Sequence, residues 1–212
     1  MYMSCFHLKT NSPSVMQCLR DANDMHRNVM KMFPQVSDAS ARKELGILYR
    51  LYRTDHETRL YISSKDLPDA SSLSYGFEMI DTPKDLAPVL DGFTAGRTYR
   101  FDLFASPTKK VESKGINSKR IFLISSKDRH EWLNRKAADA GFQIVWAREE
   151  RQETVHAALR QGKSAITCVG VQFCGVLKVV DGAAFQKAYT EGIGSQKAYG
   201  MGMMLLAATE NG

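Results

Sequence analysis

The sequence predicts an α+β fold, because strand-like and helix-like segments follow one another in a similar order in its two halves. In some segments the apolar residues alternate with polar ones, and in others they recur at helical spacing. The chain has 212 residues, of which 43% are hydrophobic. That length suits one large domain or two small ones, and the apolar content is ample for a buried core.

In the first half, residues 1–8 are rich in β-compatible side chains and predict a strand. A helix is then expected from Pro13, with apolar residues at helical spacing from Val15 to Phe33, and Pro34 ends it. Two β-rich runs, 45–53 and 59–63, flank a short polar turn and predict a hairpin. Segment 77–96 predicts a short helix and then a linker. We therefore expect one domain over residues 1–92 and a second over residues 97–212.

The second half begins with an alternating strand at 97–104, followed by a basic hairpin that ends at 121–125. The remaining segments predict a helix at 126–140, strands at 142–146 and 165–180, a helix at 181–191 and a strand at 203–207. Segment 149–161 has helix propensity but equally suits a loop or a strand. Each half thus approximates βαββαβ, so the predicted architecture is two tandem ferredoxin-like (RRM-like) domains.

Composition argues against several classes of protein. No window approaches the ~18 uninterrupted apolar residues of a membrane helix, and the first ten residues lack the pattern of a signal peptide. The four cysteines form no CxxC pair, which favours reduced thiols in a cytoplasm over disulfides or zinc. They are Cys5, Cys18, Cys168 and Cys174. We expect a cytoplasmic protein with no metal site and no small-molecule cofactor.

Positive charge is concentrated in one segment. The whole chain carries 29 Lys and Arg against 23 Asp and Glu, a net charge of +6, which by itself indicates nucleic-acid binding only weakly. Segment 109–120 has five cations and one acid, Glu112. A basic β-hairpin suits A-form RNA, whose phosphates dominate recognition, although charge alone is also compatible with an ordinary solvated hairpin. The five cations are Lys109, Lys110, Lys114, Lys119 and Arg120.

A glycine-rich loop near the C-terminus is the most unusual segment. A dinucleotide-binding loop would need a following helix to receive the phosphates, and here a strand is expected. An acyl-CoA transferase loop fails for the same reason, and Gly162-Lys163-Ser164 is no P-loop because Ala157 stands where a glycine is required. Two interpretations remain: close approach to another backbone such as RNA, or a tight helix-to-strand connection. The loop glycines are Gly192, Gly194, Gly200 and Gly202.

Residues 192–206, GIGSQKAYGMGMMLL, are similar to the glycine-rich loop of the CasE family, the crRNA-processing endoribonuclease subunit of the type I-E Cascade complex. Further similarity lies in Met25-His26-Arg27, in Phe33-Pro34 and in residues 132–136, WLNRK. The resemblance spans almost the whole chain. It implies two ferredoxin-like domains in a prokaryotic protein.

The resemblance also implies an activity. A CasE-like protein binds the CRISPR repeat hairpin and cuts pre-crRNA at the hairpin base without a metal or cofactor. The cut leaves a 2′,3′-cyclic phosphate, and the protein stays bound to crRNA among the other Cascade subunits. We expect Arg27 and Lys197 to join the hairpin cations in binding RNA. The alternative is a Cascade subunit that binds the crRNA hairpin with weak cleavage or none.

Of the five histidines, only His26 matches the catalytic position of the family. A histidine can donate or accept a proton near neutral pH, as 2′-hydroxyl attack on RNA requires. On a continuous helix His26 lies about 20° around the axis from Val15, at the edge of the apolar stripe. A histidine in that position can also simply pack in the core, which is the alternative to a catalytic role. Asn23 occupies the position of a tyrosine found in some members and cannot exchange a proton. Lys31 is a candidate for charge stabilisation, although it lies on the far side of an ideal helix.

Overall fold

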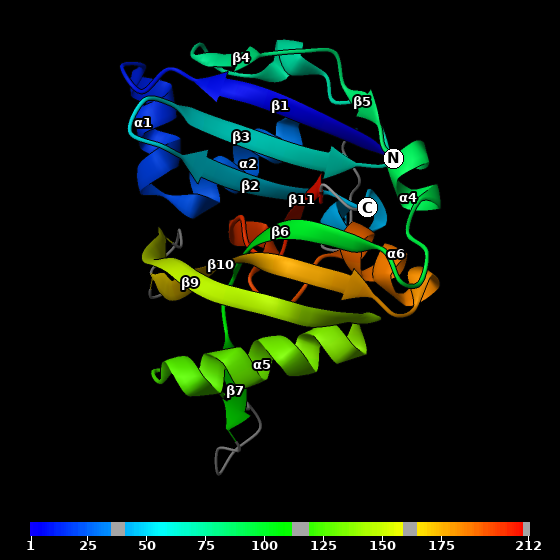
Figure 1. Ribbon diagram of the computed structural model, residues 1–212. Coiled ribbons are helices and arrows are strands. Elements are labelled where there is room, and N and C mark those ends of the chain that lie inside the picture. The colour runs from blue at the N-terminus through cyan, green and yellow to red at the C-terminus, as the bar shows by residue number, and fades with distance from the viewer. Residues whose placement is uncertain (35–40, 112–118, 159–164, 210–212) are drawn as a thin grey trace.

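The computed structural model describes residues 1–34, 41–111, 119–158 and 165–209 and contains two large antiparallel sheets (Figure 1). The predicted α+β class with antiparallel sheets is confirmed. In Figure 1 the sheet formed by the first half of the chain lies above the sheet formed by the second half. The two sheets are joined through the segment that contains helix α4 (Ala87–Asp91).

The first sheet has the strand order β2-β3-β1-β4, and the short β5 also pairs with β1. Helices α1 (Pro13–Arg20) and α2 (Ala22–Lys31) cover one face, because their apolar residues, among them Val15 and Met25, pack with Phe6 of β1. A short helix, α3 (Ala41–Glu44), precedes β2. The strands are β1 (Tyr2–Leu8), β2 (Leu48–Arg53), β3 (Thr58–Ser64), β4 (Phe77–Met79) and β5 (Lys84–Asp85).

The second sheet has the order β11-β6-β10-β9. Helices α5 (Ser126–Asp139) and α6 (Gly182–Glu191) pack on it through Trp132 and Phe185. The basic segment forms a separate two-stranded hairpin, β7 with β8, which projects beyond α5 in Figure 1. The strands are β6 (Thr98–Ala105), β7 (Thr108–Val111), β8 (Lys119–Phe122), β9 (Phe142–Ala157), β10 (Ile166–Val179) and β11 (Met204–Ala208).

Two segments differ from the sequence-based expectation. The single helix expected from Pro13 to Phe33 is broken at Asp21, whose extended backbone (φ −130°) ends α1 and whose side chain caps α2. The ambiguous segment 149–161 is a strand as far as Ala157. It is a strand because β9 pairs along its length with β10, from Phe142 opposite Val179 to Ala157 opposite Ile166.

The linking segment is part of the second core. Leu86, Leu90 and Phe93 are buried together with Trp132 and Phe185. All four cysteines are free thiols. No described helix is long and apolar enough to cross a membrane.

Candidate nucleic-acid interface and catalytic histidine

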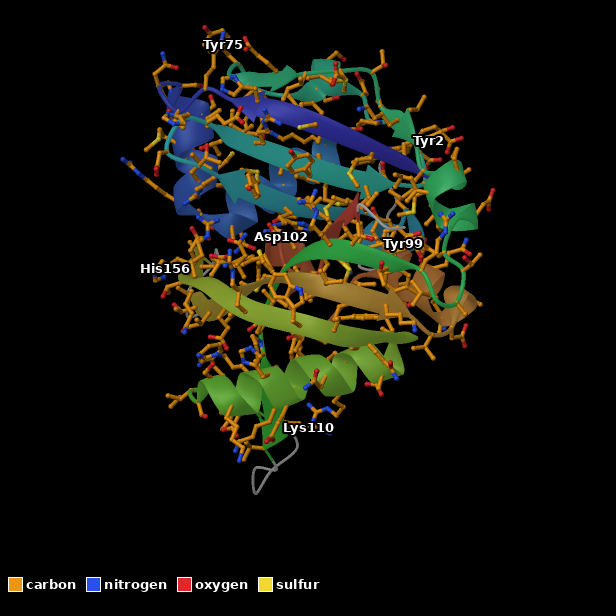
Figure 2. All side chains as sticks on the ribbon, viewed as in Figure 1. Tyr2, Tyr75, Tyr99, Asp102, Lys110 and His156 are labelled. Atoms are coloured by element: carbon orange, nitrogen blue, oxygen red, sulfur yellow. The ribbon has the colours of Figure 1, made fainter. Side chains whose placement is uncertain are left out.

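A basic cleft of about 840 Å³ lies between the β7–β8 hairpin, α5, α6 and the glycine-rich loop. Cations outnumber acids among its lining residues, and one of its two acids, Asp139, is paired with Lys136 at 3.1 Å. Figure 2 shows Lys110 on the projecting hairpin. An electropositive cleft of this kind attracts a phosphate backbone. The lining cations are Lys109, Lys110, Arg120, Arg135, Lys136, Lys187 and Lys197.

The structure brings together four of the predicted RNA-binding cations: Lys109, Lys110, Arg120 and Lys197. Lys114 lies outside the described residues, and Lys119 is described only as the first residue of β8. Sequence reasoning did not single out Arg135, Lys136 or Lys187 as RNA-binding residues. The sequence pattern of α5 and α6 predicts two helices, but it does not predict that cations from both helices line one cleft.

The four loop glycines divide into two pairs. Gly192 and Gly194 line the basic cleft, so this half of the loop is open to a ligand backbone. Gly200 and Gly202 pack inside the protein. A Cβ on Gly202 would lie 2.7 Å from the Ile193 carbonyl oxygen, and one on Gly200 would lie 3.1 Å from the Tyr49 ring. For this second pair the structure favours the tight connection over an RNA contact.

His26 lies on α2 beside Tyr49 of β2, with the two rings stacked at a centroid distance of 6.5 Å. Its Nδ1 is buried and has no hydrogen-bond partner among the described residues. Burial, and then the positive charge of Arg42, lower the pKa of His26 below its ordinary value of 6.5. The imidazole is therefore neutral near pH 7 and able to accept a proton.

Tyr49 connects His26 to the glycine-rich loop. Its hydroxyl donates a hydrogen bond of 2.6 Å to the carbonyl oxygen of Ala198, in the turn η2 (Lys197–Tyr199). Burial raises the pKa of Tyr49 far above its ordinary value, so this hydroxyl stays protonated. The turn η2 also packs directly against α2. The glycine-rich loop that borders the basic cleft thus contacts both α2, which carries His26, and Tyr49 of β2, which stacks on His26.

Asn23 does not partner His26 in this arrangement. Its amide donates to the carbonyl oxygen of Ala158, just beyond β9, while the Ala158 amide donates to Asp21 at 3.1 Å. These two hydrogen bonds tie the start of α2 to the end of the long β9 strand. The amide at the position of the family tyrosine is thus bound to protein backbone.

Two predicted residues lie apart from this site. Arg27 and Lys31 line a separate groove of about 350 Å³ on the α1–α2 surface, and Arg27 forms an ion pair with Asp24. The structure places neither of them in the basic cleft. Arg42, in the short helix α3 and outside the motifs similar to the family, is instead the cation whose charge lowers the pKa of His26. Among the described residues no group of three or more potential metal ligands comes together.

Comparison with known proteins agrees with this arrangement. The chain is 28% identical over 220 residues to the CRISPR-associated endoribonuclease Cse3 of Thermus thermophilus, covering 98% of this chain and 100% of that protein. It is 24% identical over 190 residues to the CRISPR system Cascade subunit CasE of Escherichia coli, covering 89% of this chain and 92% of that one.

Among solved structures, Thermus thermophilus Cse3 bound to an RNA representing a pre-cleavage complex superimposes with a TM-score of 0.83. It is 25% identical in sequence, covering 97% of this chain and 98% of that one. The chain also matches the family described as CRISPR associated protein over residues 1–208. Because that match spans nearly the whole chain, the protein belongs to the CRISPR-associated protein family, and the CasE resemblance predicted from its sequence is confirmed.

Proposed function

We propose that this protein is an endoribonuclease that binds the stem-loop of a CRISPR repeat, cuts pre-crRNA at the hairpin base and stays bound to the product within Cascade. The observation that carries the proposal is the contact between two features. The basic cleft ends at the glycine-rich loop, and that loop packs against α2 and hydrogen bonds to Tyr49, which stacks on His26. RNA held in the cleft is thereby brought toward a neutral imidazole.

Cleavage proceeds by in-line attack of a 2′-hydroxyl on the neighbouring phosphorus. His26 accepts the 2′-hydroxyl proton, because its lowered pKa keeps the imidazole neutral in the free protein. The bond from phosphorus to the 5′-oxygen breaks, that oxygen takes a proton from water, and protonated His26 returns its proton to the solvent. The products are a 2′,3′-cyclic phosphate and a 5′-hydroxyl end, and no step requires a metal.

The proposal extends to the domain organisation. Each half, residues 1–92 and 97–212, is a ferredoxin-like domain, and the end of the first half, with Leu86 and Leu90, packs in the core of the second. In support, the four main strands of each sheet follow the same order. The first in the chain, β1 or β6, lies between the third and the fourth, the second, β2 or β9, lies at the edge, and neighbouring strands are antiparallel. That order is the one βαββαβ connections produce in the ferredoxin-like arrangement.

Replacing His26 tests the proposal directly. The variant His26→Ala should bind the repeat RNA of its own CRISPR array as tightly as the wild type, and its single-turnover cleavage in EDTA should be slower by about 10²–10⁴-fold, as expected for loss of a general base. Binding is measured with an RNA carrying 2′-deoxyribose at the scissile position, which cannot be cut. Cleavage at the wild-type rate by His26→Ala would contradict the proposal.

The second candidate function is a Cascade subunit that holds the crRNA hairpin with little or no cleavage. It is favoured by one observation, the engagement of Asn23 with Ala158 in place of a proton-exchanging tyrosine. The end group of the RNA separates the two functions. A 2′,3′-cyclic phosphate formed by wild-type protein supports the nuclease, and uncut RNA in a tight complex supports the binding subunit.

A further inference from the structure

A second hollow of about 520 Å³ continues from the basic cleft across the first half of the molecule. The two share Lys197 and Glu191 in their linings. The second hollow adds cations from the α3 region and from the end of β3: Arg42, Lys43 and Lys65. Cations outnumber the two acids in this lining, Glu44 and Glu191, so a phosphate backbone lying in the basic cleft has a mainly electropositive path toward α3.

Arg42 and Lys197 line the same hollow although both are cations. Burial lowers the pKa of Lys197, and the charges of Arg42, Lys43 and Lys136 lower it further, against the opposing effect of Glu191. Burial likewise lowers the pKa of Arg42. Half-buried cations that repel one another are stabilised when an anion binds between them.

The hydrogen bonds of these cations leave donors available. One guanidinium nitrogen of Arg42 donates to the carbonyl oxygen of Ile47 at 2.8 Å, which fixes the direction of the side chain. Among the ion pairs formed by described residues, none includes Arg42 or Lys197. A guanidinium has five N–H donors in a planar fork, a geometry that matches two phosphate oxygens.

We infer that Arg42 and Lys197 form the binding site for the scissile phosphodiester next to His26, and that Arg42 is a catalytic residue; this inference rests on the proposed nuclease function. Three observations place the site. Arg42 and Lys197 line one hollow, η2 packs on α2, and Tyr49 contacts both the His26 ring and the loop that carries Lys197.

The site supplies charge stabilisation that Asn23 does not. As the 2′-oxygen bonds to phosphorus and the 5′-oxygen leaves, negative charge develops on the non-bridging oxygens. Arg42 and Lys197 donate hydrogen bonds to these oxygens, while His26 takes the 2′-hydroxyl proton. Hydrogen-bond donors that are held in place near this developing charge stabilise the transition state more in a half-buried site than in water.

The test compares Arg42→Gln, Arg42→Lys and wild type in single-turnover cleavage of the repeat RNA over a range of pH. Arg42→Gln should cut about 10²–10³-fold more slowly, as expected for loss of one transition-state donor. Its binding of the 2′-deoxy RNA should weaken far less. Because Arg42 lowers the pKa of His26, Arg42→Gln should also move the acid limb of the pH–rate profile to higher pH. Arg42→Lys keeps a charge and should recover part of the rate.

A matched control removes a positive charge elsewhere. Lys178 is an exposed cation of β10 that lines neither basic hollow, so Lys178→Gln should cut at the wild-type rate. The inference is overturned if wild-type protein cuts the RNA and Arg42→Gln cuts equally fast with an unshifted profile. Failure of wild-type protein to cut, or full activity of His26→Ala, overturns the proposed function itself.

Discussion

At the scale of single residues, burial changes the protonation of His26, the candidate catalytic histidine. The motif around it indicates its role, but its protonation depends first on burial and then on the charge of Arg42, which comes from α3. Its Nδ1 has no hydrogen-bond partner in the part of the chain that the structure describes, and a neutral imidazole can accept a proton. Within the proposed mechanism, the lowered pKa of His26 favours the general-base role; the sequence left the general-base and general-acid roles open.

The lowered pKa has a consequence for stability. The folded protein holds His26 with a pKa below 6.5, so the unfolded chain binds more protons as the pH falls. The free energy of unfolding should therefore decrease from above pH 6.5 downward through the lowered pKa. We expect wild type to lose more thermal stability than His26→Gln between about pH 7.5 and about pH 5.5. Equal losses in the two proteins, measured by calorimetry, would contradict this.

At the scale of elements, the glycine-rich loop joins α6 to β11 by folding back on itself. The Ile193 amide donates to the Gly202 carbonyl oxygen at 2.8 Å, and the Gly202 amide donates to Phe104 of β6 at 2.7 Å. The loop is thereby closed at its base, and its middle residues extend to Tyr49. This closure explains why one half of the loop borders the cleft and the other half is buried.

Two glycine variants test how closely Gly202 packs against the Ile193 carbonyl group. Gly202 and Gly96 have similar backbone angles, φ +88° and +93°, but a Cβ on Gly96 would meet nothing within 4 Å. Gly96→Ala should lower the free energy of unfolding by about 1–2 kcal/mol, because alanine is strained at a positive φ. Gly202→Ala should lower the free energy of unfolding by about 1–3 kcal/mol more than Gly96→Ala does, because its new methyl group is too close to the Ile193 carbonyl oxygen. Chemical denaturation measures both, and equal losses would refute the close-packing explanation.

At the scale of the whole molecule, one buried ion pair connects the two sheets. Arg50 of β2, only 1% exposed, donates to the Asp102 carboxylate of β6 at 2.6 Å and to the Asp102 carbonyl oxygen at 2.7 Å. Gln172 of β10 donates to the second carboxylate oxygen at 2.9 Å. Figure 2 shows Asp102 between the sheets. This network links β2 of the first sheet to β6 and β10 of the second.

Breaking the ion pair should destabilise the protein strongly. Asp102→Ala leaves the Arg50 charge buried without its partner, which costs about 3–5 kcal/mol in other buried pairs. The double variant Arg50→Met with Asp102→Ala removes both charges and should recover part of that loss. The measurement is the free energy of unfolding in urea. A double variant no more stable than Asp102→Ala would show that the unpaired charge is not the cause.

The sequence by itself determined the features that depend on local spacing. Alternation and helical periodicity predicted the α+β class and most strands and helices, and the basic segment was evident from composition. The motif around His26 and the glycine-rich loop identified the family. These properties are readable because side-chain period and charge are set over a few neighbouring residues.

Only the tertiary structure decided how those pieces meet. It broke the first helix at Asp21, extended β9 to Ala157 and brought Arg135, Lys136 and Lys187 to the hairpin cleft. It also bound Asn23 to Ala158 and placed Arg42 where its charge acts on His26. Each of these outcomes depends on contacts between residues far apart in the chain. Such contacts are selected by burial and hydrogen-bond geometry in the folded molecule, which residue spacing does not record.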